Sequence, residues 1–149
     1  YIWHTPSEKK NLYFTDNLII PDGAAFVPAM MWVVQGNSLS VFAVKSNARP
    51  HMRTKVYQAP FHNVDYNGDV CMGSARVKKG FDTIHSRLEA WENSFWLSKF
   101  SHLRGDSPIK EPHNINLLWK KLIETGKPFP KEVLIRTGEF RDIVKQYNL

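Results

Sequence analysis

The pattern of hydrophobic and polar positions changes midway along the chain, from strand-like runs to helix-like spacing. In the first half, short runs rich in β-branched and aromatic residues predict strands at 11–15, 29–34, 38–45 and 54–58. The stretch Gln35-Gly36-Asn37-Ser38 is typical of a hairpin connection between two of these strands. Together the runs predict an antiparallel β-meander of three or four strands.

In the second half, apolar residues recur at the spacing of an amphipathic helix and predict three helices. Asp82, Asn114 and Thr137 are the expected N-terminal caps, and Gly126 with Pro128 ends the second helix. The apolar faces consist of Ile84, Leu88, Trp91 and Phe95, of Leu118, Leu122 and Ile123, and of Phe140, Ile143, Val144 and Tyr147. Strands followed by helices, rather than alternating with them, indicate the α+β class.

The composition indicates one folded domain that spans residues 1–149. Hydrophobic residues make up 42% of the chain and charged residues 23%, which are ordinary values for a globular protein. No apolar run approaches the roughly 18 residues that a membrane span needs, so no membrane partner is expected. Because the chain opens at Tyr1 rather than Met, we expect a fragment or processed form that lacks its native N-terminus.

The cysteine count and the charge narrow the classes of function. A single cysteine excludes an internal disulfide and favours a reducing, cytoplasmic location. The six histidines show no paired spacing of the kind that metal ligands have, so no metal site is predicted. The net charge of +6 is spread over isolated pairs, which argues against nucleic acid as the main partner. An acidic protein partner explains this charge equally well.

The only thiol lies close to a predicted tight turn. Asn67-Gly68 favours a two-residue type I′ hairpin loop, which would place Val64 opposite Cys71, just before Gly73. Two interpretations of Cys71 remain open at this point. It is either a small hydrophobic residue buried in an apolar strand, or a partly exposed nucleophile with a stabilising donor nearby.

The residues around Cys71 stand at the spacing of a known catalytic signature. Asn63, Gly68, Val70 and Cys71 resemble the active-site motif of ubiquitin-conjugating enzymes, which runs His-Pro-Asn, four residues, Gly, any residue, an aliphatic residue and the catalytic Cys. The sequence departs from this motif where Phe61-His62 replaces the His-Pro pair. Pro60 stands directly before the replaced pair and stiffens the approach.

Further stretches are similar to prokaryotic family D of these enzymes, which includes protein B of the PRTRC cassettes. The likeness runs from about residue 13 to the third helix, and it rests on 47–50, 59–64, 91–95 and 100–102. It implies a ubiquitin-conjugating-enzyme-like fold, in which an antiparallel β-meander is followed by an active-site loop and packed C-terminal helices. In the cassettes, the gene stands beside a ThiF-type activating enzyme and a JAB-type metalloprotease, which the resemblance implies as partners.

The resemblance also implies a mechanism that needs no cofactor. Cys71 would accept the C-terminus of a ubiquitin-like modifier as a thioester from the activating enzyme and pass it to a lysine or another nucleophile. Asn63 would donate its side-chain amide to the oxyanion of that reaction. In an ideal hairpin the two side chains would face opposite ways, so the chain must leave regular pairing between them. The alternative is that Asn63 only caps a turn.

Two histidines are secondary candidates, because histidine exchanges protons near neutral pH. His102 would act as a general base or orient the nucleophile, unless it is a loop histidine bonded to backbone. His62 adjoins the amide donor and would tune it. Positive charge at Arg76, Lys78 and Lys79 would favour the thiolate form of Cys71, or it would form a patch on which a partner protein docks. Two other functions stay open: an inert binding module of the same fold, and a cysteine hydrolase that uses Cys71 with His102.

Overall fold

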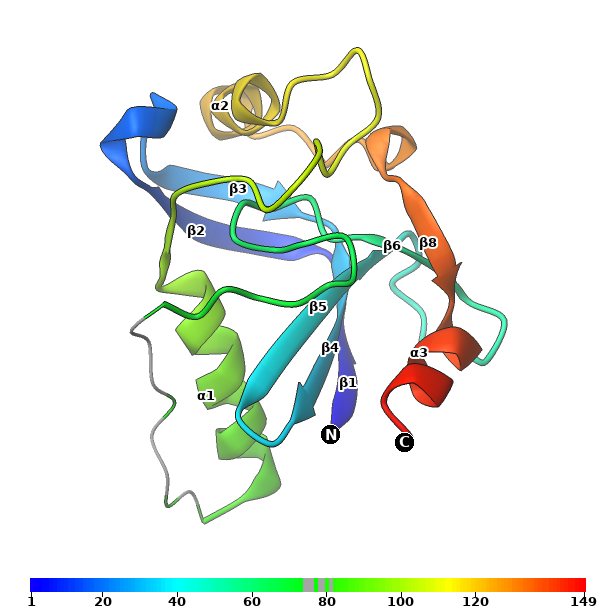
Figure 1. Ribbon diagram of the computed structural model, residues 1–149. Helices are drawn as coiled ribbons and strands as arrows, with labels where there is room; N and C mark the ends of the chain where they lie inside the picture. Colours follow the sequence, from blue (N-terminus) through cyan, green and yellow to red (C-terminus); the bar gives the residue numbers. More distant parts are fainter. Residues whose placement is uncertain (74–76, 78–79, 81) are drawn as a thin grey trace.

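Strands β1 to β6 lie in the first half of the chain, and the α-helices lie in the second half (Figure 1). The computed structural model describes residues 1–73, 77, 80 and 82–149. The strands are β1 (Ile2–Thr5), β2 (Glu8–Phe14), β3 (Gly23–Val27), β4 (Ala29–Gln35), β5 (Ser38–Val44), β6 (Lys55–Gln58), β7 (Lys99–Phe100) and β8 (Arg136–Glu139). The helices are α1 (Ile84–Trp96), α2 (Ile115–Thr125) and α3 (Phe140–Gln146), with short 3-10 turns η1 (Asp16–Leu18) and η2 (Lys131–Val133). The predicted α+β class is confirmed.

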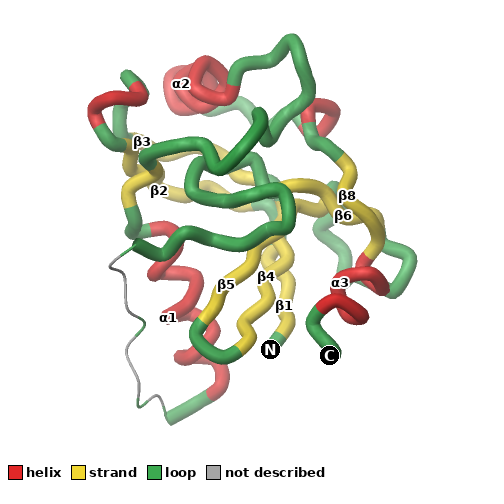
Figure 2. Tube along the Cα trace, in the orientation of Figure 1, coloured by secondary structure: helices red, strands yellow, loops and turns green. Residues whose placement is uncertain are grey.

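The strands form two sheets. The larger sheet is antiparallel and has the order β1-β4-β5-β6-β8, while the smaller one has the order β3-β2-β7, with β2 antiparallel to β3 and parallel to β7. Figure 2 shows β2 and β3 lying across the direction of β4 and β5, with α2 on one side of them and α1 on the other. Helix α2 packs on β3, and α1 packs on β2.

Both faces of the larger sheet are covered, which explains why β4 is apolar at every position from 29 to 34. Met30, Trp32 and Val34 face the main core, beneath α1, α2 and the smaller sheet. Ala29, Met31 and Val33 face a second cluster on the opposite side of the sheet. We call this second cluster the outer cluster; its other buried members are Phe42, Val44, Val56 and Ile143. A strand buried on both faces reads as a continuous apolar run.

The predicted meander is confirmed for β4, β5 and β6, and the predicted hairpin for Gln35 and Ser38, which pair across a two-residue loop. The strand predicted at 11–15 is confirmed at 11–14 as the end of β2, which begins three residues earlier, at Glu8. Its expected place in the meander is wrong, because β2 pairs with β3 and β7. Strands β1, β3, β7 and β8 were not predicted by strand spacing.

The helix limits are partly as predicted. Asn114 caps α2 by accepting from two backbone N–H groups, and Gly126 ends it in the left-handed conformation. The other two predicted caps are wrong. Thr83, not Asp82, accepts the capping bond of α1, and Glu139, not Thr137, is the N-cap residue of α3. Ile84, expected on the packed face of α1, is 53% exposed. In the described part of the chain, every helix is too short or too polar to cross a bilayer.

Candidate functional site

The segment before Cys71 completes one edge of the larger sheet. Strand β6 pairs with β5 only at Phe42 and Ala43. Nearer the start of β5, residues 68–70 pair with it in place of β6. The carbonyl of Gly68 accepts from the Val41 N–H at 2.8 Å, and the Val70 N–H donates to the Leu39 carbonyl at 3.0 Å. The chain therefore leaves the sheet after β6 and returns to the same edge, which fixes the backbone directly before the thiol.

The turn itself is longer than the sequence predicts. Val64 bridges Val70 rather than Cys71, so residues 65–69 form the loop. The Asp65 carboxylate accepts from the N–H groups of Asn67 at 2.9 Å and Asp69 at 3.0 Å, and this side chain organises the turn. The predicted type I′ turn is wrong, because within 64–70 positive φ occurs at Gly68 alone, whereas type I′ needs it at Asn67 as well.

Cys71 is exposed and lies where this pairing ends. Its backbone N–H donates to the carbonyl of Asn63 at 2.7 Å, and two residues later Gly73 takes φ +53. The thiol thus stands on an anchored backbone but outside the core, unlike the buried strand cysteine of the first interpretation. Exposure of the sulfur is the property that a nucleophile needs.

Asn63 links the segment that carries Cys71 to residues 99–102. It adopts φ +66, a conformation that asparagine tolerates better than most residues, and its side chain is 7% exposed. Its amide Nδ2 donates to the Lys99 carbonyl at 3.1 Å, while Oδ1 accepts from Ser101 N at 3.2 Å, Ser101 Oγ at 3.1 Å and His102 N at 3.3 Å. An NH₂ group carries two protons, so the bond to Lys99 leaves one for another acceptor.

His102 belongs to the same hydrogen-bonded group, although its ring is exposed. Its carbonyl accepts from the Asn63 N–H at 2.9 Å, and its Nδ1 lies 2.9 Å from the Ser101 hydroxyl. The structure therefore brings three of the predicted residues together, with Asn63 between Cys71 and His102. The links that join them run through backbone groups.

His62 lies in the loop that follows β6 and leads to Asn63, and its ring contacts α2. It is 1% exposed, and its Nε2 lies 2.7 Å from the Asn116 side-chain oxygen. Burial lowers the pKa of His62 below 6.5; the hydrogen bond to Asn116 opposes this, and the charge of His102 adds to it. The neutral imidazole thus donates from Nε2 and holds the loop to the helix.

Two neighbours of His62 strengthen this anchor. The Pro60 carbonyl accepts from Trp119 Nε1 at 2.9 Å, and the Phe61 ring stacks on Trp119 with centroids 5.1 Å apart. Phe61 also contacts the rings of Phe95, Trp96 and Phe100. The residues that replace the family's His-Pro pair therefore fix the loop by aromatic packing and by bonds to α2.

Arg104, in the segment that follows β7, binds the turn at residues 65–69. Its guanidinium donates to the Asp69 carbonyl at 3.1 Å and lies 3.7 Å from the Asp65 carboxylate. Nothing in the sequence near Arg104 signals this contact, because its partners precede it by more than thirty positions. The predicted basic group of Arg76, Lys78 and Lys79 lies outside the described residues.

Comparison with known proteins identifies the family of the chain. The family model for prokaryotic E2 family D matches residues 1–137, which is most of the chain. The chain belongs to this family, as the resemblance of the stretches 47–50, 59–64, 91–95 and 100–102 predicts, and its role is therefore related to ubiquitin-like conjugation. The match ends at the second residue of β8, three residues before α3 begins. No curated protein and no solved structure matches the chain.

Proposed function

We propose that the chain is a ubiquitin-conjugating-type enzyme that carries the C-terminus of a ubiquitin-like modifier as a thioester on Cys71. The observation that carries the proposal is the exposed Cys71 directly behind a turn anchored at the sheet edge, in a chain of this family. A carrier thiol must meet two large partners in turn, the donor and the acceptor. Exposure on a fixed backbone suits that task.

The reaction has two steps. In loading, the Cys71 thiolate attacks the thioester carbonyl on a ThiF-type activating enzyme, and the activating enzyme's thiolate leaves as the new carbon–sulfur bond forms. In discharge, an acceptor amine attacks the carbonyl on Cys71, the Cys71 thiolate leaves, and the amine's extra proton passes to solvent or a base. Each step passes through a tetrahedral oxyanion, which a hydrogen-bond donor stabilises. In loading, the activating enzyme supplies groups around this centre as well, whereas in discharge the stabilising donor must come from the chain that carries Cys71.

Asn63 is the proposed donor to that oxyanion. Its Nδ2 has one proton beyond the bond to Lys99, and its backbone carbonyl already holds the Cys71 N–H. His102 is the proposed base or orienting group for the acceptor, through the ring nitrogen that does not face Ser101. His62, bound to α2, supports the position of Asn63 from the adjacent residue.

A catalytically inert binding module of the same fold is the second candidate. The bonds of Asn63 to Lys99, Ser101 and His102 favour it, because they give this side chain a purely architectural use. In that case, the chain would hold a ubiquitin-like protein without forming a covalent bond to it.

One experiment separates the candidates. The protein is incubated with the activating enzyme from its own operon, ATP and the modifier, and gels are run with and without reductant. A reductant-sensitive adduct that disappears in Cys71→Ala supports the enzyme. Absence of any adduct, with binding intact, favours the inert module. Release of free modifier without an adduct indicates a cysteine hydrolase acting through Cys71 and His102.

The role of Asn63 needs a sharper variant than alanine. Asn63→Ala removes all the side-chain bonds and disfavours φ +66, so it perturbs the fold as well as the donor. Asn63→Asp keeps an Oδ1 acceptor for Ser101 and His102 and tolerates this backbone conformation, but it has no N–H to donate. We expect Asn63→Asp to slow discharge by about 100- to 1,000-fold and to slow loading less. Equal slowing of both steps would contradict the oxyanion role.

A further inference from the structure

Ser40 is a polar residue on a face of the sheet that is otherwise apolar. It lies on β5 on the same side as Phe42 and Val44, which belong to the outer cluster, and it is 2% exposed. A buried hydroxyl needs hydrogen-bond partners, and Ser40 has two. Its Oγ donates to Asp69 Oδ1 at 2.7 Å and accepts from the Tyr147 hydroxyl at 2.8 Å.

These bonds form a relay from the C-terminal end of α3 to the turn before Cys71. The Tyr147 phenol donates to the Ser40 hydroxyl, and the Ser40 hydroxyl donates to the Asp69 carboxylate. The second bond ends on a carboxylate, and hydrogen bonds to ionised groups are stronger than neutral ones. We call Tyr147, Ser40 and Asp69 the relay.

Tyr147 is itself held in place. Its ring packs on the outer cluster, and its backbone carbonyl accepts from Gln35 Nε2 at 3.2 Å. Burial raises the pKa of the Tyr147 phenol above 10.0; the bond to Ser40 lowers it, and the charge of Asp69 raises it further. The phenol therefore stays protonated at neutral pH and acts as a donor.

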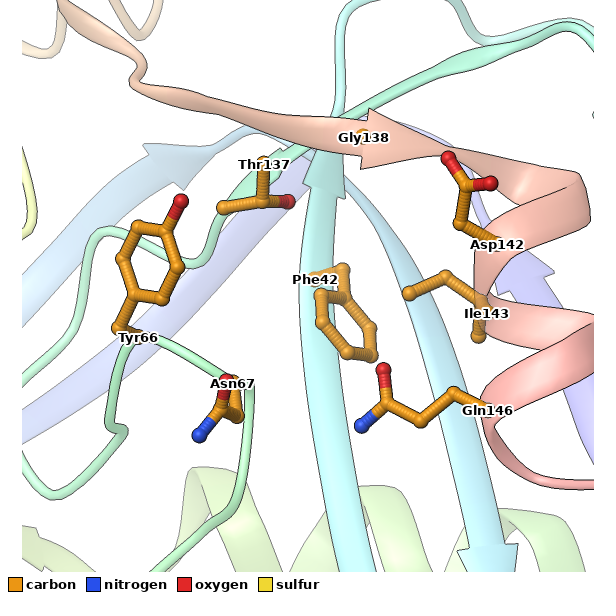
Figure 3. A pocket seen from close by; sticks show the side chains of 8 residues that line it. All are labelled: Phe42, Tyr66, Asn67, Thr137, Gly138, Asp142, Ile143 and Gln146. Carbon is orange, nitrogen blue, oxygen red and sulfur yellow. The ribbon is translucent and has the colours of Figure 1, made fainter.

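Elsewhere, α3 and the turn are separated by a pocket of about 90 Å³. Figure 3 shows Tyr66 and Asn67 of the turn on one side of it, Asp142 and Gln146 of α3 on the other, and Phe42 between them. The relay bridges from α3 to the turn beside this gap. Its far end, Asp69, stands two residues before Cys71.

From these contacts, we propose that Tyr147 is a positioning residue for acyl transfer at Cys71, acting through Ser40 and Asp69 on the turn that precedes the thiol. The proposal rests on the proposed function. It adds a residue that lies beyond the family match, which ends at residue 137. By holding Asp69, the relay steadies the bonds of the next two N–H groups, from Val70 to Leu39 and from Cys71 to Asn63.

The test uses Tyr147→Phe, which removes the hydroxyl and keeps the ring in the outer cluster. Tyr13→Phe on β2 is the matched control, since Tyr13 is also partly buried and lies outside the relay. Hydrogen exchange of the Val70 and Cys71 amides should rise about three- to tenfold in Tyr147→Phe, the factor that one hydrogen bond of ordinary strength supplies. The control should leave both amides unchanged.

Transfer kinetics then separate positioning from general loosening. With the loaded activating enzyme as the varied substrate, kcat for transfer through Cys71 should fall about three- to tenfold in Tyr147→Phe while KM stays the same. In the Ser40→Ala background the path through Ser40 is cut and only the 3.5 Å contact of the Tyr147 hydroxyl with Asp69 Oδ1 remains, so Tyr147→Phe should have a much smaller further effect. Additive losses in the double variant would overturn the relay.

The outcomes for this inference and for the proposed function are distinct. If the wild-type protein forms no adduct, the proposed function fails. If the wild-type adduct forms but Tyr147→Phe leaves amide exchange and kcat unchanged, only the positioning role fails. Faster exchange with unchanged kcat also overturns it, because the turn would then move without consequence for transfer.

Discussion

Gly68 offers a direct test of how tightly the turn is packed against the sheet. It has φ +88, and a Cβ built there would lie 2.5 Å from Cζ and 2.6 Å from Cε1 of Phe42, and 2.9 Å from the Val41 carbonyl oxygen. Phe42 cannot swing aside, because its ring is buried in the outer cluster. The Val41 oxygen is backbone in the middle of β5 and is equally fixed.

Gly68→Ala therefore combines two costs. An alanine in the left-handed region costs about 1–2 kcal/mol, and forcing a methyl group into a packed core costs about 1–3 kcal/mol. We expect the free energy of unfolding to fall by about 2–5 kcal/mol, which corresponds to a Tm lower by about 4–20 °C for a chain of this size. Because Gly68 holds the edge of β5 three residues before Cys71, transfer through the thiol should slow as well.

Gly36→Ala is the matched control. Gly36 also has positive φ, +60, in a hairpin turn, but beyond its chain neighbours no atom lies within 4 Å of the position that a Cβ would take. Gly36→Ala should lower the free energy of unfolding only by the cost of placing alanine in the left-handed region, about 1 kcal/mol, and leave transfer through Cys71 unchanged. Urea denaturation of both variants measures the difference. Equal losses for the two variants would refute the reasoning, because the contact of Gly68 with Phe42 would then have no energetic effect.

Three further predictions concern the loop and the thiol. Burial lowers the pKa of His62 in the folded chain. Below pH 6.5 this histidine therefore binds a proton in the unfolded chain more readily than in the folded one, and the free energy of unfolding falls as the pH drops. His62→Gln should reduce this decline, measured by urea denaturation at pH 7.5 and 5.5. Trp119→Phe should leave the Pro60 carbonyl unpaired and cost about 1–3 kcal/mol more than Trp96→Phe, since the buried Nε1 of Trp96 has no partner among the described residues. Cys71→Ala should change stability by less than about 0.5 kcal/mol, because the side chain is exposed; a larger loss of Tm would contradict that placement.

The elements predicted from the sequence are those whose signal is local. Strands β4 and β5 follow from unbroken apolar runs, and α2 follows from its apolar spacing between Asn114 and Gly126. Strand β8 carries no such signal, because it has charged ends and a glycine and exists through its pairing with β6. The charged first residues of β2, 8–10, carry no strand signal either, although the rest of this strand was predicted; their pairing with β3, not their composition, makes them part of the strand.

The residues of the candidate site follow the same rule: those with a local sequence signal were predicted, and those that reach the site from distant segments were not. The family signature predicts Cys71 and Asn63 as site residues. For Asn63 the prediction rests on the family likeness, since in an ideal hairpin its side chain would face away from Cys71. The turn type was mispredicted because the Asn67-Gly68 pair is outweighed by the Asp65 side chain, which caps a longer loop. Asn116, Trp119 and Arg104 were missed because each reaches the site from a segment far along the chain, and no local pattern records such a contact.

The anchors of the site share one property, which bears on the choice between carrier and hydrolase. The edge of β5 binds the backbone of residues 68–70, α2 binds Pro60 and His62, and Asn63 binds the Cys71 N–H through its carbonyl. All of them fix the chain around the sulfur and leave the sulfur exposed. A hydrolase needs a base held against its nucleophile, yet the ring contact of His102 is with Ser101. A carrier needs a fixed, exposed thiol that two large partners can reach in turn, and the anchors produce such a thiol, which favours the proposed carrier over the hydrolase.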